Sequence, residues 1–367
     1  MLNYYQPHLL PFLKFRSNPL PDGVACLYYH SFEDGLWDLI RNFYPGKKLH
    51  FLVPDFYCSD VLDNIRSRGH KYTYYPLDEN FQISSSQFKK YLWLFKPDIV
   101  VIFHACGITS GLAGDTSWLS DLPETSLVLE DSVHLLVDPS KLKFWGDRHF
   151  VMDSLRKVSP LPGSRIFGRK KVLELGGAKN SFVSGYFLSS VFFYLAFRTV
   201  LGIGFLLNSS RIVAYSHECI LRKHDDIIGD NLIPQGGLGF FRFLFNRFDY
   251  RKVGKIKQIQ VEAYQQVLAP LFNSPGFYRI DIPVSDYSAL HVYPVGVMGK
   301  PDEKLIKFFH SRGLPVWFKF TDTPWSQSRG VLFFPLGFHV SVKAINNLIK
   351  IFYDNSNPSS SFLFPSI

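Results

Sequence analysis

Short apolar segments alternate with helical segments through the first half of this 367-residue chain. Apolar residues recur at helical spacing in EDGLWDLIRNF (33–43), and the helical segment 58–68 is followed by Gly69, a residue typical of helix C-termini. Four short apolar runs predict strands at LHFLVP (49–54), KYTYYPL (71–77), DIVVIFH (98–104) and SLVLED (126–131). Strands and helices that alternate at this pace form parallel βαβ units with helices on both faces of the sheet. The first half therefore predicts an α/β domain.

The second half changes character twice. Residues 178–265 are helical, first apolar and then basic, and strands return from Tyr278 onward. We predict these later strands at YRIDIP, ALHVYPVGV, PVWFKF and GVLFFPL, and helices at 301–312 and 341–353. The expected organisation is an N-terminal arm (1–22), a large α/β domain (23–240), a long helix with a small C-terminal α+β domain (241–355) and a flexible tail (356–367).

The segment from Phe182 to Leu207 is almost wholly apolar. Arg198 divides it into runs of about sixteen and about nine residues, whereas a membrane-spanning helix needs about 20 consecutive apolar residues. We therefore expect a buried helix pair or an interfacial helix over 182–207, with contact to a membrane surface as the alternative. The N-terminus lacks a signal-peptide pattern, so a cytoplasmic location is the default expectation.

The chain is basic, with 40 Lys and Arg against 31 Asp and Glu and a formal charge of +9. Such a surplus attracts phosphates, nucleic acid or anionic lipid without selecting among them. Arg and Phe interleave at 240–251, but core packing explains these phenylalanines better than base stacking, so we expect no nucleic-acid partner. The cysteines form no CxxC pair and no cluster with histidine, so neither a zinc site nor a disulfide framework is expected.

Polar residues end two of the predicted strands, which is where chemistry gathers in parallel sheets. His104 ends one strand and Asp131 ends another. Lys157 comes 26 residues after Asp131, and the intervening strand FWGDRHFVMDS can bring the lysine back beside the carboxylate. The motifs that carry this constellation are LVLEDSVH (127–134), MDSLRK (152–157) and the turn PLPGS (160–164).

This constellation meets the chemical needs of pyridoxal phosphate. The cofactor needs a lysine amine to hold it, a buried carboxylate to keep its pyridine nitrogen protonated, and hydroxyl or backbone N–H donors around its phosphate. Lys157, Asp131 and Ser154 would fill these roles in that order. Taken alone, each has a plainer explanation, because strand-end acids often cap helices and lysines are usually solvated. Ser-x-x-Lys also occurs in β-lactamase-like acyl-enzymes, but their Lys-Thr-Gly and Ser-Asp-Asn signals are missing.

Four other motifs have simpler explanations. GGLGFFRF (236–243) and LGGAK (175–179) are expected to be loops, since no strand of dinucleotide-binding type precedes the first. The basic stretches 222–226 and 246–257 are expected to be solvated helix faces, with binding of a nucleotide-sugar diphosphate as the alternative.

The order of the motifs resembles the DegT-like sugar aminotransferases, within the fold type I (aspartate aminotransferase-like) pyridoxal phosphate enzymes. The resemblance spans about residues 23–353 and rests on the ordered set rather than on one strict motif. In the first half the matching segments are YYHSFEDGLWDLI, LVPDFYCSDVLDNI, RGHKYTYYPLD, FHACG, LEDSVH and DSLRK. In the second half they are NRFDYRKVGKIKQIQVEAYQQVLAPL, RGLPVWFKF and VLFFPLGFHVSVKAINNLIKIF.

This resemblance implies an α/β fold with a mostly parallel seven-stranded-type sheet, a small C-terminal α+β domain, and a homodimer. It implies that Lys157 binds the cofactor and acts as the catalytic base, and that Asp131 pairs with the pyridine nitrogen. The further cofactor-binding residues expected at this site are His134, Ser154, Ser31, Tyr57, Cys58 and His104.

The implied reaction is amino transfer from an amino-acid donor to a sugar or nucleotide-sugar ketone, in amino-sugar or surface polysaccharide biosynthesis. The sequence departs from the family at the phosphate turn, Ser31-Phe32-Glu33-Asp34, where acidic side chains would repel a phosphate. It also has Gly163-Ser164 in place of a double glycine, and Gln260 in place of an arginine. The alternative function is therefore that of a catalytically degenerate relative, which serves as a binding or scaffold module.

Overall fold

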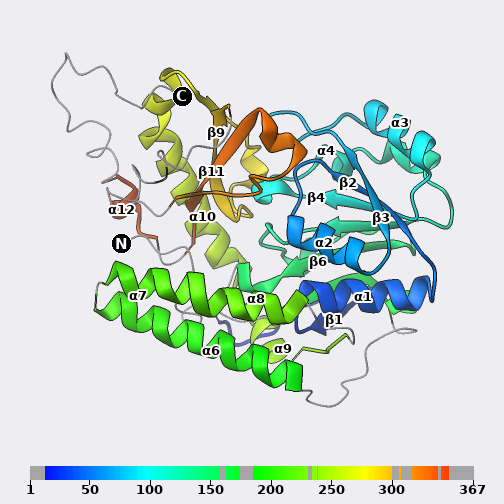
Figure 1. Cartoon of the computed structure of the whole chain (residues 1–367), viewed down its shortest axis with the longest axis horizontal. Helices are drawn as coiled ribbons and strands as arrows, with labels where there is room; N and C mark the ends of the chain where they lie inside the picture. The colour runs from blue at the N-terminus through cyan, green and yellow to red at the C-terminus, as the bar shows by residue number, and fades with distance from the viewer. Residues whose placement is uncertain are drawn as a thin grey trace.

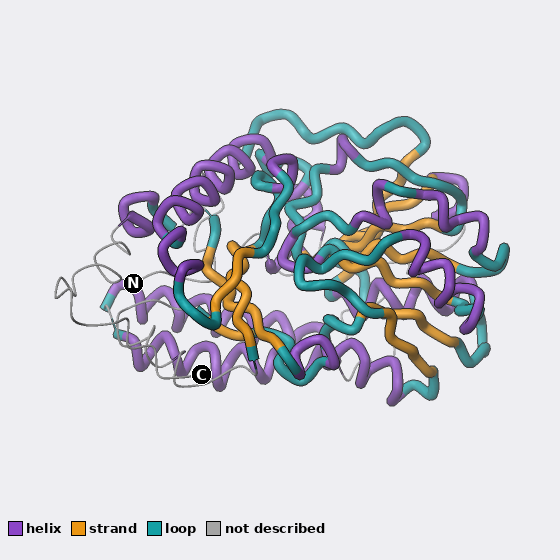
Figure 2. The backbone as a smooth tube through the Cα atoms, turned by 90° about the horizontal axis from the view of Figure 1, so that it is seen from above, coloured by secondary structure: helices purple, strands orange, loops and turns teal. Residues whose placement is uncertain are grey.

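Two β-sheets organise the protein, and Figure 2 shows them as separate groups of strands. A computed structural model describes residues 13–157, 163–173, 185–207, 209–229, 234–237, 239–299, 306, 316–337 and 340–346. The predicted tail (356–367) and the LGGAK motif lie outside these residues, as do most of the PLPGS turn and most of the predicted helix 301–312.

The large sheet has seven strands in the order β1-β7-β6-β5-β4-β2-β3. Its pairings are parallel from β3 through to β6, whereas β7 is antiparallel to both β6 and β1. The strands are β1 Val24–Tyr29, β2 His50–Pro54, β3 Lys71–Tyr75, β4 Ile99–Phe103, β5 Leu127–Asp131, β6 His149–Ser154 and β7 Ser164–Arg169. The predicted α/β class with a mostly parallel seven-stranded sheet is confirmed.

Helices connect these strands, and Figure 1 shows α1 and α3 on opposite sides of the strands. They are α1 Phe32–Phe43, α2 Ser59–Ser67, α3 Ser85–Phe95, the single turn α4 Gly111–Gly114 and the short α5 Lys170–Leu173. The α1 helix packs closely on the sheet at Gly35, where a Cβ atom would lie 3.1 Å from Ile166 Cδ1 and 3.1 Å from Met152 Cε. This close approach fixes the N-terminus of α1 at the sheet edge that forms the site.

The small domain contains an antiparallel sheet in the order β10-β11-β9-β8, and its strands lie in the four segments predicted from the sequence. Its elements are the long helix α10 Tyr250–Val267, β8 Phe277–Arg279, β9 Val292–Met298, β10 Trp317–Phe318, β11 Arg329–Pro335 and α12 Val342–Asn346. The strand expected at YRIDIP is short, because it ends at Arg279 and Asp281 N–H donates to the Asn80 side chain instead. The rest of the helix predicted at 341–353 lies outside the described residues.

A helical layer runs along one edge of the molecule, where α6 packs beside α7 and α8 (Figure 1). These elements are α6 Gly185–Leu206, α7 Ser210–Tyr215, a π-helical turn Ser216–Leu221, α8 Arg222–Gly229 and α9 Gly239–Phe245. The segment 182–207, expected to be a buried helix pair or an interfacial helix, forms the single helix α6 over its described residues, and only one face of that helix is buried. Among the described residues, no helix is long and apolar enough to cross a membrane.

Buried contacts fix the small domain against the large one. Arg165 on β7 forms an ion pair with Asp153 on β6, and its Nη1 donates to Tyr250 Oη at 2.6 Å at the start of α10. Gly107, after β4, has a φ of +95°, and a Cβ there would lie 2.5 Å from the His134 carbonyl oxygen and 2.7 Å from His291 N. Only glycine fits this junction, which brings the small domain to the carboxyl edge of the large sheet.

Candidate functional site

A cavity of about 90 Å³ lies at the carboxyl ends of β4, β5 and β6. It is lined by seven of the eight predicted site residues: Ser31, Tyr57, Cys58, Asp131, His134, Ser154 and Lys157. The other lining residues are His30, Phe32, Glu33, Val61, Phe103, Val133, Gly163, His224 and Phe320. The fold therefore brings predicted site residues that lie as far apart in sequence as Ser31 and Lys157, a separation of 126 positions, into one cavity.

Asp131 is the buried acid of this cavity. Its Oδ2 accepts a hydrogen bond from Tyr57 Oη at 2.6 Å, and its Oδ1 accepts one from Val133 N at 3.1 Å. Burial raises the pKa of Asp131 to about 6, with a smaller rise from the charge of Glu33, although the two hydrogen bonds oppose the shift. Burial and the neighbouring carboxylate also raise the pKa of Tyr57 well above its ordinary value, so this phenol stays a donor.

Lys157 enters the cavity from a 3₁₀ turn that follows β6, and Ser154 ends that strand. Burial lowers the pKa of His134 well below its ordinary value, and the positive charges of Lys157 and Lys319 lower it further. The neutral His134 ring accepts a hydrogen bond from Cys106 N at its Nδ1 (3.2 Å). Burial and Asp60 raise the pKa of Cys58 to about 11, so this thiol is protonated at neutral pH.

The α1 end of the cavity has a different character. Ser31 is the N-cap of α1: its Oγ accepts from Asp34 N at 3.0 Å and donates to Asp34 Oδ2 at 2.8 Å. Asp34 Oδ1 accepts from Gln235 N at 3.0 Å, so this carboxylate is held in the helix cap. Glu33, in contrast, lines the cavity, and its charge contributes to the raised pKa values of Asp131 and Tyr57.

Two histidines extend the site beyond the sequence prediction. His30 precedes the α1 cap and hydrogen-bonds through Nε2 to Ser190 Oγ of α6, and His224 Nδ1 on α8 donates to the Ser190 carbonyl oxygen at 2.9 Å. Burial and the nearby His224 lower the pKa of His30 to about 3, so its ring is neutral. His30 could have been found beside the phosphate turn, but His224 lies in the basic stretch 222–226, where only the tertiary packing of α8 reveals it.

Phe320 brings the small domain to the cavity. It follows β10 and has a φ of +54°, which is uncommon for a bulky side chain. Its carbonyl oxygen accepts hydrogen bonds from Thr323 Oγ1 at 3.0 Å and Ser326 Oγ at 2.6 Å, which hold this backbone in place. The Phe320 ring stacks on His134 with centroids 5.7 Å apart. Phe320 ends the segment RGLPVWFKF, which resembles the family, but nothing in that segment predicted it as a site residue.

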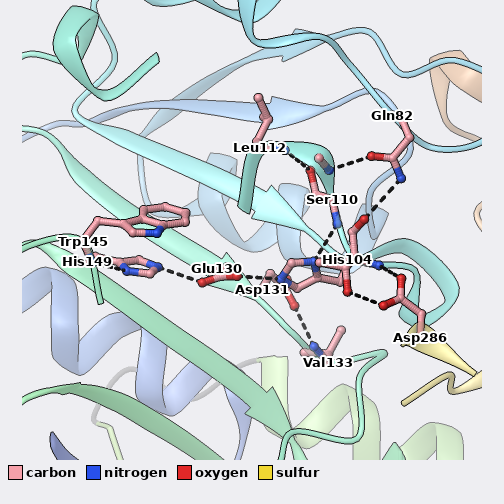
Figure 3. Close-up of polar contacts among 12 residues, drawn as sticks. Gln82, His104, Ser110, Leu112, Glu130, Asp131, Val133, Trp145, His149 and Asp286 are labelled. Atoms are coloured by element: carbon pink, nitrogen blue, oxygen red, sulfur yellow. Dashed lines mark hydrogen bonds and ion pairs between the residues drawn. The ribbon is translucent and has the colours of Figure 1, made fainter. Parts of the chain in front are cut away.

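His104 is the one predicted site residue that does not line the cavity. The preceding residue, Phe103, does line it, and successive side chains on an extended chain point to opposite sides. His104 instead faces Glu130: its Nδ1 accepts from Ser110 N at 3.0 Å, and its Nε2 donates to Glu130 Oε1 at 3.0 Å (Figure 3). His104 therefore contacts Glu130 within the protein, in place of the contact with the cofactor that the sequence predicted.

The donor set of the cavity fits pyridoxal phosphate. A lysine amine, a buried carboxylate and the Ser154 hydroxyl line the same cavity. The cofactor requires these three groups for its carbonyl carbon, its ring nitrogen and its phosphate, in that order. Glu33 is the one acidic side chain at the α1 end that works against the phosphate. Among the described residues, no group of three or more His, Cys, Asp or Glu side chains could hold a metal ion.

The chain has the fold of the type I pyridoxal phosphate-dependent aminotransferases. It is similar to a DegT DnrJ EryC1 StrS aminotransferase from Brucella abortus, with 12% identity, a TM-score of 0.54, and coverage of 90% of this chain and 86% of that one. It is also similar to DesV of S. venezuelae, with 13% identity, a TM-score of 0.57, and coverage of 97% of this chain and 90% of that one. A third similar structure is the sugar aminotransferase CalS13 from Micromonospora echinospora, with 13% identity, a TM-score of 0.55, and coverage of 90% of this chain and 87% of that one. The sequence matches no model of a protein family and no curated protein.

Proposed function

We propose that this protein is a pyridoxal phosphate-dependent aminotransferase that acts on a sugar or nucleotide-sugar ketone, with an amino acid as donor. The observation that carries the proposal is the convergence of Lys157, Asp131 and Ser154 on one cavity at the carboxyl edge of the large sheet. The sugar substrate class is supported by the similarity of the fold to sugar aminotransferases. A homodimer, as in the family that the sequence resembles, is part of this proposal.

Each residue has a defined task in the proposed reaction. When bound, the cofactor supplies a ring that withdraws electrons from the carbon bonded to the transferred nitrogen. Asp131 would hold the proton on the ring nitrogen, and the Tyr57 hydroxyl fixes the orientation of that carboxylate. Lys157 Nζ would bind the cofactor's carbonyl carbon and, once displaced, carry a proton between the substrate and the cofactor. Ser154 Oγ would donate to the phosphate.

The test compares two lysine variants in a titration with pyridoxal phosphate and in an amino-transfer assay with keto-sugar substrates. The native protein should develop an absorbance band near about 420 nm. Lys157→Ala should lose the band and lower the amino-transfer rate by at least about 10³-fold, because among the described lining residues Lys157 alone carries a primary amine. Lys141→Ala, at an exposed position, is the matched control and should retain both. A Lys157→Ala protein that stays coloured and active would contradict the proposal.

A second candidate is a non-catalytic relative that uses the fold for binding or as a scaffold. Glu33 favours it, since this carboxylate lines the cavity at the end where a phosphate dianion would lie. This candidate predicts a folded native protein that binds no pyridoxal phosphate in the same titration.

A further inference from the structure

The composition of α6 is unusual for a helix at the edge of a protein. Its 22 residues, Gly185–Leu206, include no acidic residue and one basic residue, Arg198, so the helix is apolar on all sides. A helix of this kind is normally covered on every side, by protein or by lipid. In this protein α6 lies along the outer edge of the molecule (Figure 1).

The inner face of α6 is held firmly by protein. Tyr194, Phe197 and Leu201 are buried and pack with Leu221 of the π-helical turn. The Ser190 carbonyl oxygen accepts the hydrogen bond from His224, which itself lines the cavity. These contacts anchor α6 to the protein and leave its outer face as the surface that needs an explanation.

The outer face carries large apolar side chains at spacings of three, four and eight residues, with the exposed Thr199 inside the longest interval. These spacings place them on one side of the helix. We call these residues the α6 stripe: Leu188, Phe192, Leu195, Ile203 and Leu206, with exposed fractions of 58%, 66%, 56%, 44% and 87%. The stripe extends about 27 Å along the helix. Proteins seldom expose this many large apolar side chains along one face of a helix unless another surface covers them.

The described charged side chains of α6 and of the neighbouring α8 are mostly basic, although the two rings that they contact are not part of the stripe. The Lys223 ammonium lies 5.8 Å from the centroid of the Phe193 ring on the flank of α6, and the Arg198 guanidinium lies 6.0 Å from the Phe197 ring. Arg222 is also exposed on α8, against one exposed acid of that helix, Asp226, among its described side chains. Long basic side chains packed along an apolar surface can place their charges at the lipid headgroups.

We propose that the α6 stripe binds the surface of an anionic lipid bilayer, with its apolar side chains at the boundary between headgroups and acyl chains and the adjacent Lys and Arg side chains at the lipid phosphates. A second copy of the chain fits this surface less well. A two-fold interface would bring the stripes and the nearby basic side chains of both copies together, and among the described charged side chains of α6 and α8 only Asp226 is acidic. This proposal does not depend on whether the cofactor binds.

The test is flotation of the full-length protein with vesicles of phosphatidylcholine, with and without phosphatidylglycerol. The protein should float with the anionic vesicles and much less with the neutral ones. The double variant Phe192→Ser/Leu195→Ser should lower the bound fraction by at least about tenfold, since it removes two exposed apolar side chains. The control Trp93→Ser/Leu94→Ser removes two similarly exposed side chains from α3 and should bind as the native protein does.

A second variant, Arg222→Glu/Lys223→Glu, should weaken binding to the anionic vesicles and remove the difference between the two lipid mixtures. Thermal melting checks that each variant is folded, and light scattering gives its oligomeric state. Absence of flotation by the native protein, or equal binding by the native protein and the α6 variant, would overturn the proposal. Conversion of a dimer to a monomer by the α6 variant, without vesicle binding by the native protein, would assign the stripe to a second copy and would also overturn it.

Discussion

Glu130 and Asp131 are adjacent on β5 and face opposite sides of it, and their environments differ accordingly. Glu130 accepts hydrogen bonds from His104 Nε2 at 3.0 Å and His149 Nε2 at 2.8 Å (Figure 3). Burial alone would raise the pKa of Glu130, but these two donors outweigh it and lower the pKa to about 2. Asp131, on the cavity side, has a pKa raised to about 6. One acid is therefore paired within the protein, and the other is available to a ligand.

The difference shows that two adjacent residues of one strand can have separate roles: Glu130 stabilises the fold, and Asp131 faces the cavity. The imidazoles of His104 and His149 each accept a backbone N–H at Nδ1, from Ser110 and Trp145, so each has its hydrogen on Nε2 and donates to Glu130. The Glu130 carboxylate and the two imidazoles thus hydrogen-bond to partners within the protein and require no ligand. Asp131 has protein donors at both oxygens, but it lines the cavity and carries an unfavourable burial cost that a cationic ring nitrogen would offset.

The largest effect is expected for Asp131→Asn. The amide cannot hold a proton on a ring nitrogen, so the amino-transfer rate should fall by about 10³-fold or more, while Lys157 still binds the cofactor. Stability at neutral pH should change by no more than about 1 kcal/mol, because removal of the buried charge offsets the contact of the amide NH2 with one of the two donors, Tyr57 Oη or Val133 N. Steady-state kinetics and urea denaturation measure the two quantities. An unchanged rate would make Asp131 a structural acid like its neighbour.

The converse result is expected for Glu130→Gln. A glutamine amide offers one acceptor and one donor, so one of the two histidine N–H groups would face another donor in a buried site. We expect a loss of about 2–3 kcal/mol in the free energy of unfolding, with unchanged kcat for the folded enzyme. Glu124→Gln, at an exposed position, is the control and should cost less than about 0.5 kcal/mol. If Glu130→Gln instead abolished activity at unchanged stability, the functional assignment of the two acids would be reversed.

The two acids should also give opposite dependences of stability on pH. Asp131 has a raised folded-state pKa, so its stabilising contribution is present below about pH 4 and is lost as the pH rises through about 6. Glu130 has a lowered pKa, so its contribution is present above about pH 4.5 and is lost as the pH falls toward about 2.

Urea denaturation of the native protein and both variants between about pH 3 and pH 8 tests this pair of signs. The difference in stability between Asp131→Asn and the native protein should move by roughly 2 kcal/mol in favour of the variant from about pH 4 to pH 7, starting from a deficit at pH 4. The deficit of Glu130→Gln should shrink as the pH falls below about 4.5. Parallel curves for the two variants would contradict the contrast between the two faces of β5.

A smaller effect is expected at the α1 end of the cavity. Glu33→Gln removes a negative charge from the cavity lining and should tighten binding of pyridoxal phosphate by about three- to tenfold. Asp34 is left unchanged because it holds the α1 cap and Gln235 N. Glu124→Gln again serves as the control, and an absorbance titration measures the affinity. Binding by neither the native protein nor Glu33→Gln, with both folded, would exclude the cofactor and leave the scaffold function.

Local sequence patterns predicted β2 to β6 of the large sheet, because these strands are short apolar runs separated by clear turns. They did not predict β1 and β7, and the count of seven strands came from the family resemblance. Strand ends and the chemistry of the cofactor led to Asp131, Lys157 and Ser154, whereas the family resemblance alone led to the other four lining residues that were predicted, Ser31, Tyr57, Cys58 and His134. The side of the sheet to which the His104 side chain points could not be predicted, since the position of a strand end does not determine whether the next side chain points into the cavity or away from it. His224 and Phe320 come from segments distant in sequence, and the apolar α6 gave no signal of which face is exposed.

The central claim is that Lys157 binds pyridoxal phosphate covalently in the cavity that Asp131 faces. Borohydride reduction of the protein saturated with pyridoxal phosphate, followed by peptide mapping with mass spectrometry, tests it most directly. We predict one labelled peptide, with the modification on Lys157 and none on exposed lysines such as Lys141 at stoichiometric cofactor. Labelling of a different lysine, or no stable labelling of the folded protein, would contradict the account.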